Sequence, residues 1–480
     1  MKQFDAWLEK SWKKIYILLS AAIVVAYAIL ALDRTVWGDE AYTFALIRHS
    51  FPEIWKITAA DVHPPLYYFL MKIFGAPFGY NLYVCRFLSA LPMALTAVLG
   101  GWQLEKCFGK RTAALFMVLY PLFPFTMDYG AEVRMYGLSQ LFVTLCALFA
   151  YRAYRENQRK HWALFLVFGT CAAYTHYFAL VSAGVIYGLL LLAVLIGKRK
   201  LWKPWGLASL ATIVLFLPWL GSFVSQLAYK VSNEYWIEPI TLSTVINYGI
   251  TLFSARGMTA FTLFFALAYA AAFVLLLVSG KERALVGLAA LAVPVGTLAV
   301  GLAASILVRP VFVIRYLLPS VPLLVFFFAY SLAGLRSEAL VSSLVTVCVM
   351  GGISNGLVAA KAAVFPAENR LTRAVVSSLP DYDVCVVLGG NALHASQELS
   401  YWDPETPIYT EDALLGADNP YPNRLPYEDF RQVEGTWQRV LLVLAEGDAV
   451  PEDFSDYSAE YLRGITVSGT GQSLWYLEKK

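Results

Sequence analysis

Two adjacent carboxylates, Asp39 and Glu40, stand in the stretch VWGDEAYTF, a few residues after a long apolar run. Trp37 and Tyr42 flank them on either side. Because adjacent carboxylates repel each other, one of them is favoured to take up a proton while the other orients it or a bound hydroxyl group. The pair therefore predicts a general base, although acids at the start of a helix also stabilise the helix dipole without doing any chemistry.

Further polar residues recur in short segments between later apolar runs. These segments are HPP, MDYGAEVRMYG, YTHYF and VIRYLLP, and they carry His63, Asp128, Glu132, Arg134, Tyr136, His176 and Arg315. An arginine clamp for a phosphate and a carboxylate that removes a hydroxyl proton would suit transfer from a phosphate-linked donor. Each residue also has a structural alternative, since interfacial histidines pack among aromatic side chains and Arg315 could anchor a span by snorkelling.

The elements that carry these residues are predicted to be membrane helices. Hydrophobic residues make up 59% of the 480 residues and charged residues only 15%, where soluble domains average roughly 25% charged. The first apolar run follows a basic flank and has no small-residue cleavage site, which predicts a retained helix rather than a signal peptide. The chain is therefore predicted to be a polytopic α-helical membrane protein.

Eleven spans fit the apolar runs. They are predicted at residues 15–32, 82–104, 112–127, 135–151, 161–177, 178–196, 206–224, 259–279, 283–308, 314–335 and 339–360. Lysine and arginine gather in alternate loops, which by the positive-inside rule places the N-terminus in the cytoplasm and all the candidate polar residues outside. The segment HPPLYYFLMKIFGAPFG is too short for a span and is predicted as a helix in the membrane interface.

Two domains are expected, a membrane module at 1–360 with a first outer loop at 33–81, and a soluble domain at 361–480. Residues 1–360 carry 28 Lys and Arg against 15 Asp and Glu, whereas residues 361–480 carry 9 against 19. In the acidic part, DVCVVLGG and RVLLVLAEG are typical of buried strands and ITVSGTGQSLWYLEKK of a hairpin. This part is predicted to be an extracytoplasmic α/β domain, and no nucleotide-binding or nucleic-acid-binding motif occurs in it.

The order of five motifs resembles a known family. DE after the first span, HPPLYYFL, EVRMYGLS, THYF and RYLLPSVPLL together resemble the bacterial glycosyltransferases allied to protein O-mannosyltransferases, with the aminoarabinose transferase of lipid A as a more distant relative. These enzymes have the GT-C fold. The resemblance covers roughly residues 15–335.

The resemblance implies an inverting glycosyltransferase that moves a hexose or pentose from a polyprenyl-phosphate donor to a hydroxyl acceptor at the outer face of the plasma (inner) membrane. Asp39 takes the place of the family's base, with Glu40 as its partner. His63 is similar in position to a lysine near the donor phosphate, and Glu132 and Arg134 match the second acidic motif. Asp128, Tyr136, His176 and Arg315 are expected beside the donor.

The expected partners are this donor, membrane lipid and an acceptor that is a glycan, a lipid or a protein, with no nucleic acid. The resemblance implies that no metal is required. A divalent metal stays open as an alternative, because Asp39, Glu40, Asp128 and Glu132 all offer oxygen ligands.

Three other functions stay open from the sequence. A transporter would place ionisable residues in mid-span, whereas here they stand at span ends. A non-catalytic lipid-binding scaffold would tolerate replacement of Asp39. A polysaccharide polymerase or ligase would use the same kind of donor at the same face.

Overall fold

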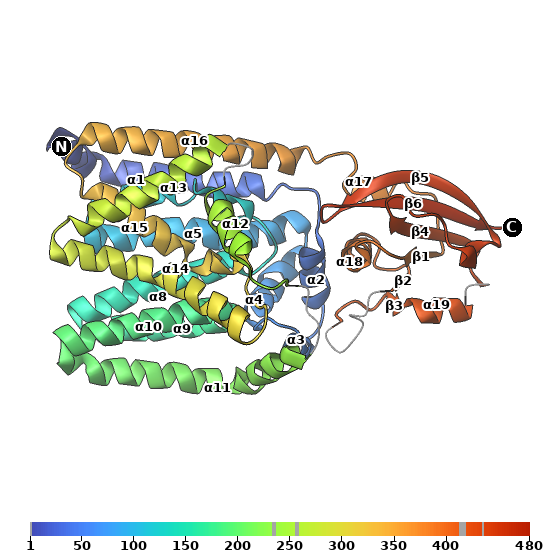
Figure 1. Ribbon diagram of the computed structural model, residues 1–480, viewed down its shortest axis with the longest axis horizontal. Coiled ribbons are helices and arrows are strands. Elements are labelled where there is room, and N and C mark those ends of the chain that lie inside the picture. Colours follow the sequence, from blue (N-terminus) through green and yellow to red (C-terminus); the bar gives the residue numbers. More distant parts are fainter. Residues whose placement is uncertain (1, 233–236, 255–258, 412–418, 434–435) are drawn as a thin grey trace. The chain divides into compact units, whose positions relative to one another are not determined.

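The computed structural model describes residues 2–232, 237–254, 259–411, 419–433 and 436–480. Contacts divide the chain into two compact units (Figure 1). The helical unit comprises Met1–Ala31, His63–Tyr67 and Leu82–Ala360, and the mixed unit comprises Leu32–Val62, Tyr68–Asn81 and Lys361–Lys480. The expected domains placed the whole loop 33–81 in the membrane module, whereas most of this loop groups with the C-terminal part of the chain.

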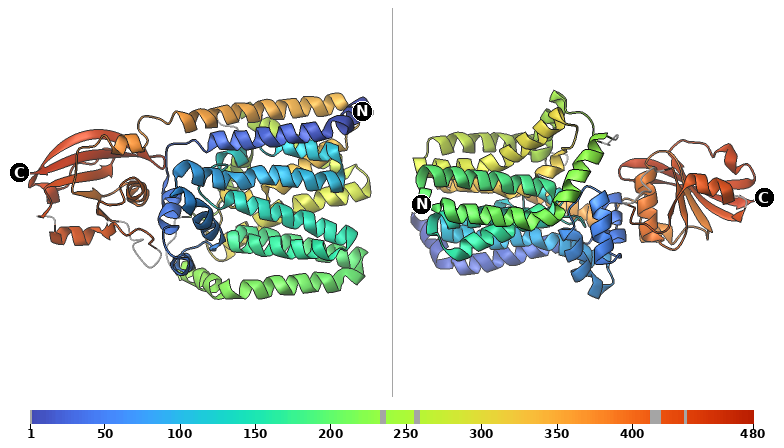
Figure 2. Two further views of the ribbon diagram at one scale, coloured as in Figure 1. Left: turned by 180° about the vertical axis from the view of Figure 1, so that it is seen from behind. Right: turned by 90° about the horizontal axis from the view of Figure 1, so that it is seen from below.

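The helical unit is built from long helices that run alongside one another (Figure 2). Their bounds are α1 (Lys2–Leu30), α5 (Leu82–Phe108), α6 (Lys110–Leu119), α7 (Pro124–Asp128), α8 (Tyr136–Glu156), α9 (Arg159–Thr175), α10 (Tyr177–Gly197), η2 (Arg199–Leu201), α11 (Trp202–Ser232), α12 (Leu242–Phe253), α13 (Thr259–Leu277), α14 (Lys281–Leu307), η3 (Ile314–Ser320), α15 (Val321–Ala333) and α16 (Glu338–Val364).

Eight helices among the described residues are long and apolar enough to cross a membrane, so the expected count of eleven spans is not confirmed. The expected spans at 112–127, 135–151 and 161–177 do form helices, but these helices are too short or too polar to be counted among the eight. Helix α6 has 10 residues and is followed by Pro121 and Pro124, and α9 has 17 residues. Helix α8 contains Ser139, Gln140 and Thr144 and ends on charged residues, which lowers its apolar character.

Helix α15 is the central helix of this unit. Its sequence VPLLVFFFAYSLA is apolar on every side, as expected for a helix surrounded by others, and every residue from Val321 to Leu332 is buried. Short 3₁₀ helix η3 precedes α15 and contains Pro319, which removes a backbone donor and interrupts regular α-helix. Arg315 therefore stands at the entrance to the most buried helix.

The first turn of α8 packs closely against α5. A Cβ atom at Gly137 would lie 2.6 Å from the backbone oxygen of Ser89, so only glycine lets the two helices meet at this distance. The phenol of Tyr67 shares a hydrogen bond of 2.8 Å with the Ser89 hydroxyl in the same region. Tyr136 and the preceding turn are thereby held against α5.

The mixed unit contains a six-stranded sheet in the order β3-β2-β1-β4-β6-β5. The strands are β1 (Val384–Val387), β2 (Ile408–Thr410), β3 (Arg424–Pro426), β4 (Arg439–Ala445), β5 (Tyr457–Val467) and β6 (Thr470–Lys479). Strands β3, β2, β1 and β4 are parallel, and β6 and β5 add antiparallel strands at one edge. The turn between β5 and β6 is Ser468–Gly469, both with positive φ, which suits a two-residue hairpin. The predicted α/β domain, its two buried strands and its closing hairpin are confirmed.

Helices cover both faces of this sheet. The remaining elements are α2 (Gly38–Leu46), α3 (Phe51–Ala60), α4 (Leu66–Gly75), η1 (Ala76–Phe78), α17 (Arg373–Val376), α18 (Ala392–Trp402), α19 (Tyr427–Val433) and η5 (Glu452–Phe454). Alternate residues of β1 enter two different cores, one with Ala395 and Leu399 of α18 and the other with Tyr427 and Phe430 of α19. The short helix predicted after HPP is α4, which has 10 residues.

Replacement of Gly137 by alanine tests the approach of α8 to α5. The added methyl group meets backbone rather than a mobile side chain, so we expect a loss of about 1–3 kcal/mol and a lower unfolding temperature in detergent. Gly184→Ala is the control, because no atom lies within 4 Å of a Cβ at that helical position. Equal unfolding temperatures for the two variants would contradict the close packing.

Candidate active site

Helix ends of the helical unit bring basic and aromatic side chains together. We call His63, Arg134, His176 and Arg315 the basic cluster. Arg134 Nη2 lies 3.4 Å from His63 Nε2, and the rings of His63 and His176 lie 5.9 Å apart between centroids. His176 is within electrostatic range of His63, Arg134 and Arg315. Four residues that the sequence scatters over about 250 positions thus form one group.

Aromatic side chains enclose the basic cluster. The ring of His176 lies 5.1 Å from that of Tyr316 and 6.0 Å from that of Tyr136, and the guanidinium carbon of Arg315 lies 5.9 Å from the ring of Tyr316. Tyr136 and Tyr316 are themselves buried. Such walls exclude water, so the charges that they surround act more strongly on a bound anion than they would in solvent.

His176 occupies the break between α9 and α10. Its extended backbone ends α9, and its Nδ1 accepts a hydrogen bond of 3.1 Å from the backbone N–H of Phe178, which caps α10. Because Nδ1 accepts this bond, a neutral ring carries its proton on Nε2. The cap therefore explains why almost no loop separates these two helices, and it fixes which nitrogen of His176 can donate to a ligand.

Arg134 follows a tight turn in which its backbone N–H donates to the oxygen of Glu132 at 2.7 Å. The Arg134 side chain is only 3% exposed, and that of His176 is 3% exposed. The predicted acids of the same segment lie close by, since Tyr129 is within electrostatic range of Asp128, Glu132 and Arg315. The structure thus brings together the seven residues of the helical unit that the sequence nominated.

Asp39 and Glu40 belong to the mixed unit, in the first turn of α2. Glu40 is fully buried, and its Oε2 accepts a hydrogen bond of 3.5 Å from the backbone N–H of Trp37. Asp39 is half-buried, and its backbone oxygen accepts from the Thr43 hydroxyl at 3.1 Å. Glu40 thus caps the helix, and Asp39 has the more accessible carboxylate.

Helix α18 of the C-terminal domain carries a buried carboxylate that the sequence did not nominate as a site residue. Glu398 is 1% exposed, and its Oε1 accepts from the Ser468 hydroxyl at 3.3 Å. Burial raises the pKa of Glu398 to about 8, and the charge of Glu40 adds to this rise, while Arg370 and the Ser468 hydrogen bond oppose it. No motif marks Glu398, because its partners come from distant segments of the chain.

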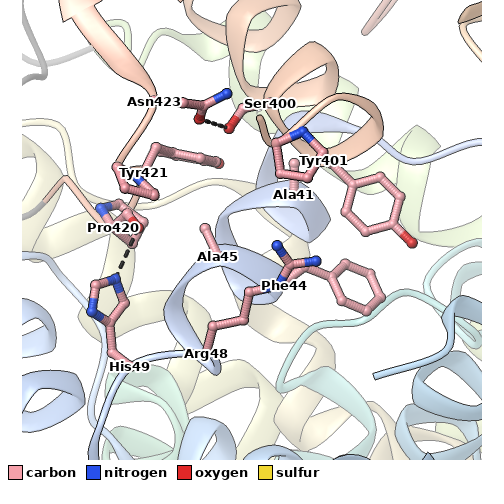
Figure 3. A pocket seen from close by; sticks show the side chains of 12 residues that line it. Ala41, Phe44, Ala45, Arg48, His49, Ser400, Tyr401, Pro420, Tyr421 and Asn423 are labelled. Atoms are coloured by element: carbon pink, nitrogen blue, oxygen red, sulfur yellow. Dashed lines mark hydrogen bonds between the residues drawn. The ribbon is translucent and has the colours of Figure 1, made fainter. Parts of the chain in front are cut away.

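A pocket of about 150 Å³ lies between α2 and the C-terminal part of the mixed unit (Figure 3). Phe44, Tyr401 and Tyr421 form much of its wall, and Arg48, two residues after the end of α2, extends along it (Figure 3). His49 Nε2 lies 2.9 Å from the backbone oxygen of Pro420 at one side. None of the residues nominated from the sequence lines this pocket.

The described residues hold no group of three or more His, Cys, Asp and Glu that is placed to bind a metal ion. The four oxygen ligands considered from the sequence are divided between the two units, with Asp39 and Glu40 in the mixed unit and Asp128 and Glu132 in the helical unit.

Residues 62–222 match the model of the dolichyl-phosphate-mannose-protein mannosyltransferase family. This segment includes every nominated residue except Asp39, Glu40 and Arg315. A comparison with curated proteins finds no significant match.

Two solved structures of ArnT from Cupriavidus metallidurans align with nearly the whole chain. The apo structure has a TM-score of 0.64 at 12% identity and covers 96% of this chain and 97% of that chain. The structure bound to undecaprenyl phosphate has a TM-score of 0.63 at 12% identity, covering 97% and 98%. This chain has the GT-C fold. The fold resemblance expected from the five motifs is thereby confirmed, and the alignment with ArnT also covers most of the C-terminal part of the chain, which the motifs did not cover.

The different roles of the two carboxylates in this GT-C protein can be tested by hydrogen exchange. Glu40→Ala removes the acceptor of the Trp37 N–H, so we expect a loss of about 1 kcal/mol and roughly fivefold faster exchange of α2 amides. Asp39→Asn is the matched control and is expected to leave this exchange near wild type. Faster exchange in Asp39→Asn than in Glu40→Ala would reverse the assignment.

Proposed function

We propose that the protein is an inverting glycosyltransferase that moves a sugar from a polyprenyl-phosphate donor to a hydroxyl acceptor at the outer face of the plasma (inner) membrane. The observation that carries the proposal is the basic cluster, which gathers two arginines and two histidines at the helix ends of a GT-C fold. The family match over residues 62–222 and the likeness to ArnT, whose structure contains undecaprenyl phosphate, support it.

The basic cluster suits a phosphate leaving group. When the bond between the anomeric carbon and the phosphate oxygen breaks, negative charge grows on the phosphate, which then leaves as polyprenyl phosphate. Arg134 and Arg315 can stabilise this charge with paired N–H donors, and His176 can donate from Nε2. A phosphate that leaves as an anion needs no general acid.

Asp39 is proposed as the general base. The acceptor hydroxyl gives its proton to the Asp39 carboxylate while its oxygen attacks the anomeric carbon from the side opposite the phosphate, so the configuration inverts. One displacement completes the transfer, and no covalent sugar–enzyme intermediate is needed. The proposal includes no metal, because the charge on the leaving group is balanced by protein cations.

The proposed orientation has the N-terminus in the cytoplasm and the candidate residues outside. Its support is the gathering of lysine and arginine in alternate loops, together with the position of His176, Arg315 and Tyr136 at helix ends that meet in one cluster. The transfer assay identifies the sugar and the molecule that carries the acceptor hydroxyl.

Transfer by Asp39→Asn tests the base. Purified protein in detergent, with or without EDTA, is given radiolabelled polyprenyl-phosphate mannose or arabinose and a membrane extract, and labelled product is measured. We expect wild type to label an acceptor and Asp39→Asn to be slower by about 100-fold or more, with donor binding retained. Equal labelling by both proteins would remove Asp39 from the chemistry, and labelling abolished by EDTA alone would show that a metal is needed.

Donor binding by Arg134→Lys tests the basic cluster. Lysine keeps the charge but loses the paired donors of the guanidinium, so we expect affinity for polyprenyl phosphate to fall about tenfold. Arg199→Lys is the control, because Arg199 is an exposed arginine of the same unit. If both variants bind like wild type, phosphate recognition lies elsewhere.

A further inference from the structure

The helix that carries Asp39 and Glu40 packs on helix α18 of the C-terminal domain, within the mixed unit. A Cβ atom at Gly38 would overlap His394 Nδ1 and come within 2.6 Å of Gln397 Oε1. Along the same line, the rings of Trp37 and His394 lie 6.2 Å apart, and those of Phe44 and Tyr401 lie 4.8 Å apart. One helix face thus meets α18 from its first residue to its last turn.

Glu398 lies one residue beyond Gln397, at this contact. It is almost completely buried, and the electrostatic influence of Glu40 reaches it from α2. Ser468 of the β5–β6 turn donates to it, and Arg370 attracts it from the segment that pairs with β5 at Thr466.

Other titratable groups also face α18. Arg424 of β3 donates Nε to the Ser396 hydroxyl at 3.0 Å, Cys385 of β1 is buried in the same core as Ala395 and Leu399, and His394 stands one turn before Glu398. The group with the same sign of charge that acts on Glu398 most directly is therefore Glu40.

The pKa of Glu398 determines how this contact responds to pH. It rises from the ordinary 4.5 to about 8 in the folded protein because burial disfavours the charged form. Undocking of α2 that exposes Glu398 to water lowers its pKa towards 4.5, so between these two values docking weakens as pH rises towards 8 and then levels off. Above that pH, Glu398 is ionised in both forms, so its protonation no longer favours docking.

We propose that Glu398 is a positioning residue for α2, holding the candidate catalytic helix in place while it is protonated and loosening it when it ionises. This inference rests on the proposed function in one respect, namely that Asp39 on α2 is the base. The C-terminal domain would then be part of the transferase machinery, because it supplies the surface on which α2 is set.

The experiment is hydrogen exchange of α2 amides in the full-length protein in detergent between pH 5.5 and 9, with rates corrected for intrinsic exchange. In wild type, we expect protection of α2 to fall by up to about tenfold per pH unit until pH 8 and to stay constant above it. In Glu398→Gln, which cannot ionise, protection should not change with pH. Glu405→Gln, an exposed acid of the same domain, should follow wild type.

A pH profile of Glu398→Gln that matches wild type would overturn the proposal, as would a wild-type profile with no change near pH 8. If Glu398→Gln fails to fold, Arg370→Gln decides. Loss of this attracting cation favours the protonated form, so the levelling point should move to higher pH, and an unchanged point would count against the proposal. None of these measurements requires a donor. Absence of transfer in the assay above would therefore count against the proposed function but not against the role of Glu398.

Discussion

The burial of a guanidinium is the constraint on which the helical unit depends. Arg134 is 3% exposed, and a charge taken out of water is tolerated only where hydrogen bonds and opposite charges replace the solvent. The contact of its Nη2 with His63 Nε2 replaces part of that solvent, and the backbone turn at Glu132 fixes where the side chain starts. In the proposed function, this helix end is preorganised for the donor phosphate, because folding has already removed the Arg134 guanidinium from water.

The mixed unit also buries an ionisable side chain, in this case a carboxylate. Glu40 is fully buried in the first turn of α2, where its carboxylate caps the backbone and lies in the favourable field of the helix N-terminus. Asp39 next to it stays half-buried. Two neighbours of one chemical type thus differ in burial, because successive side chains leave a helix in different directions.

Much of this arrangement could be predicted from the sequence, and the reasons for the exceptions are physical. Span ends and polar motifs located the basic cluster, because residues at consecutive helix ends on one face must meet. The expected count of eleven spans is not confirmed, since Pro121 and Pro124 follow the short helix α6 and polar residues lower the apolar character of α8. The grouping of α2 with the C-terminal domain was not predictable, because Gly38 packs against His394 and Gln397, which lie about 350 positions away and belong to no motif.

The contact between Gly38 and His394 also orders events during synthesis. The two residues are about 350 positions apart, so α2 leaves the ribosome long before its supporting helix exists. At roughly 5–20 residues per second, the interval is on the order of 20–70 s. Helix α2 lacks its docking surface throughout that interval. A chain that stops before α18 never provides this surface. The first loop can thus complete its packing only after the C-terminal domain has been synthesised.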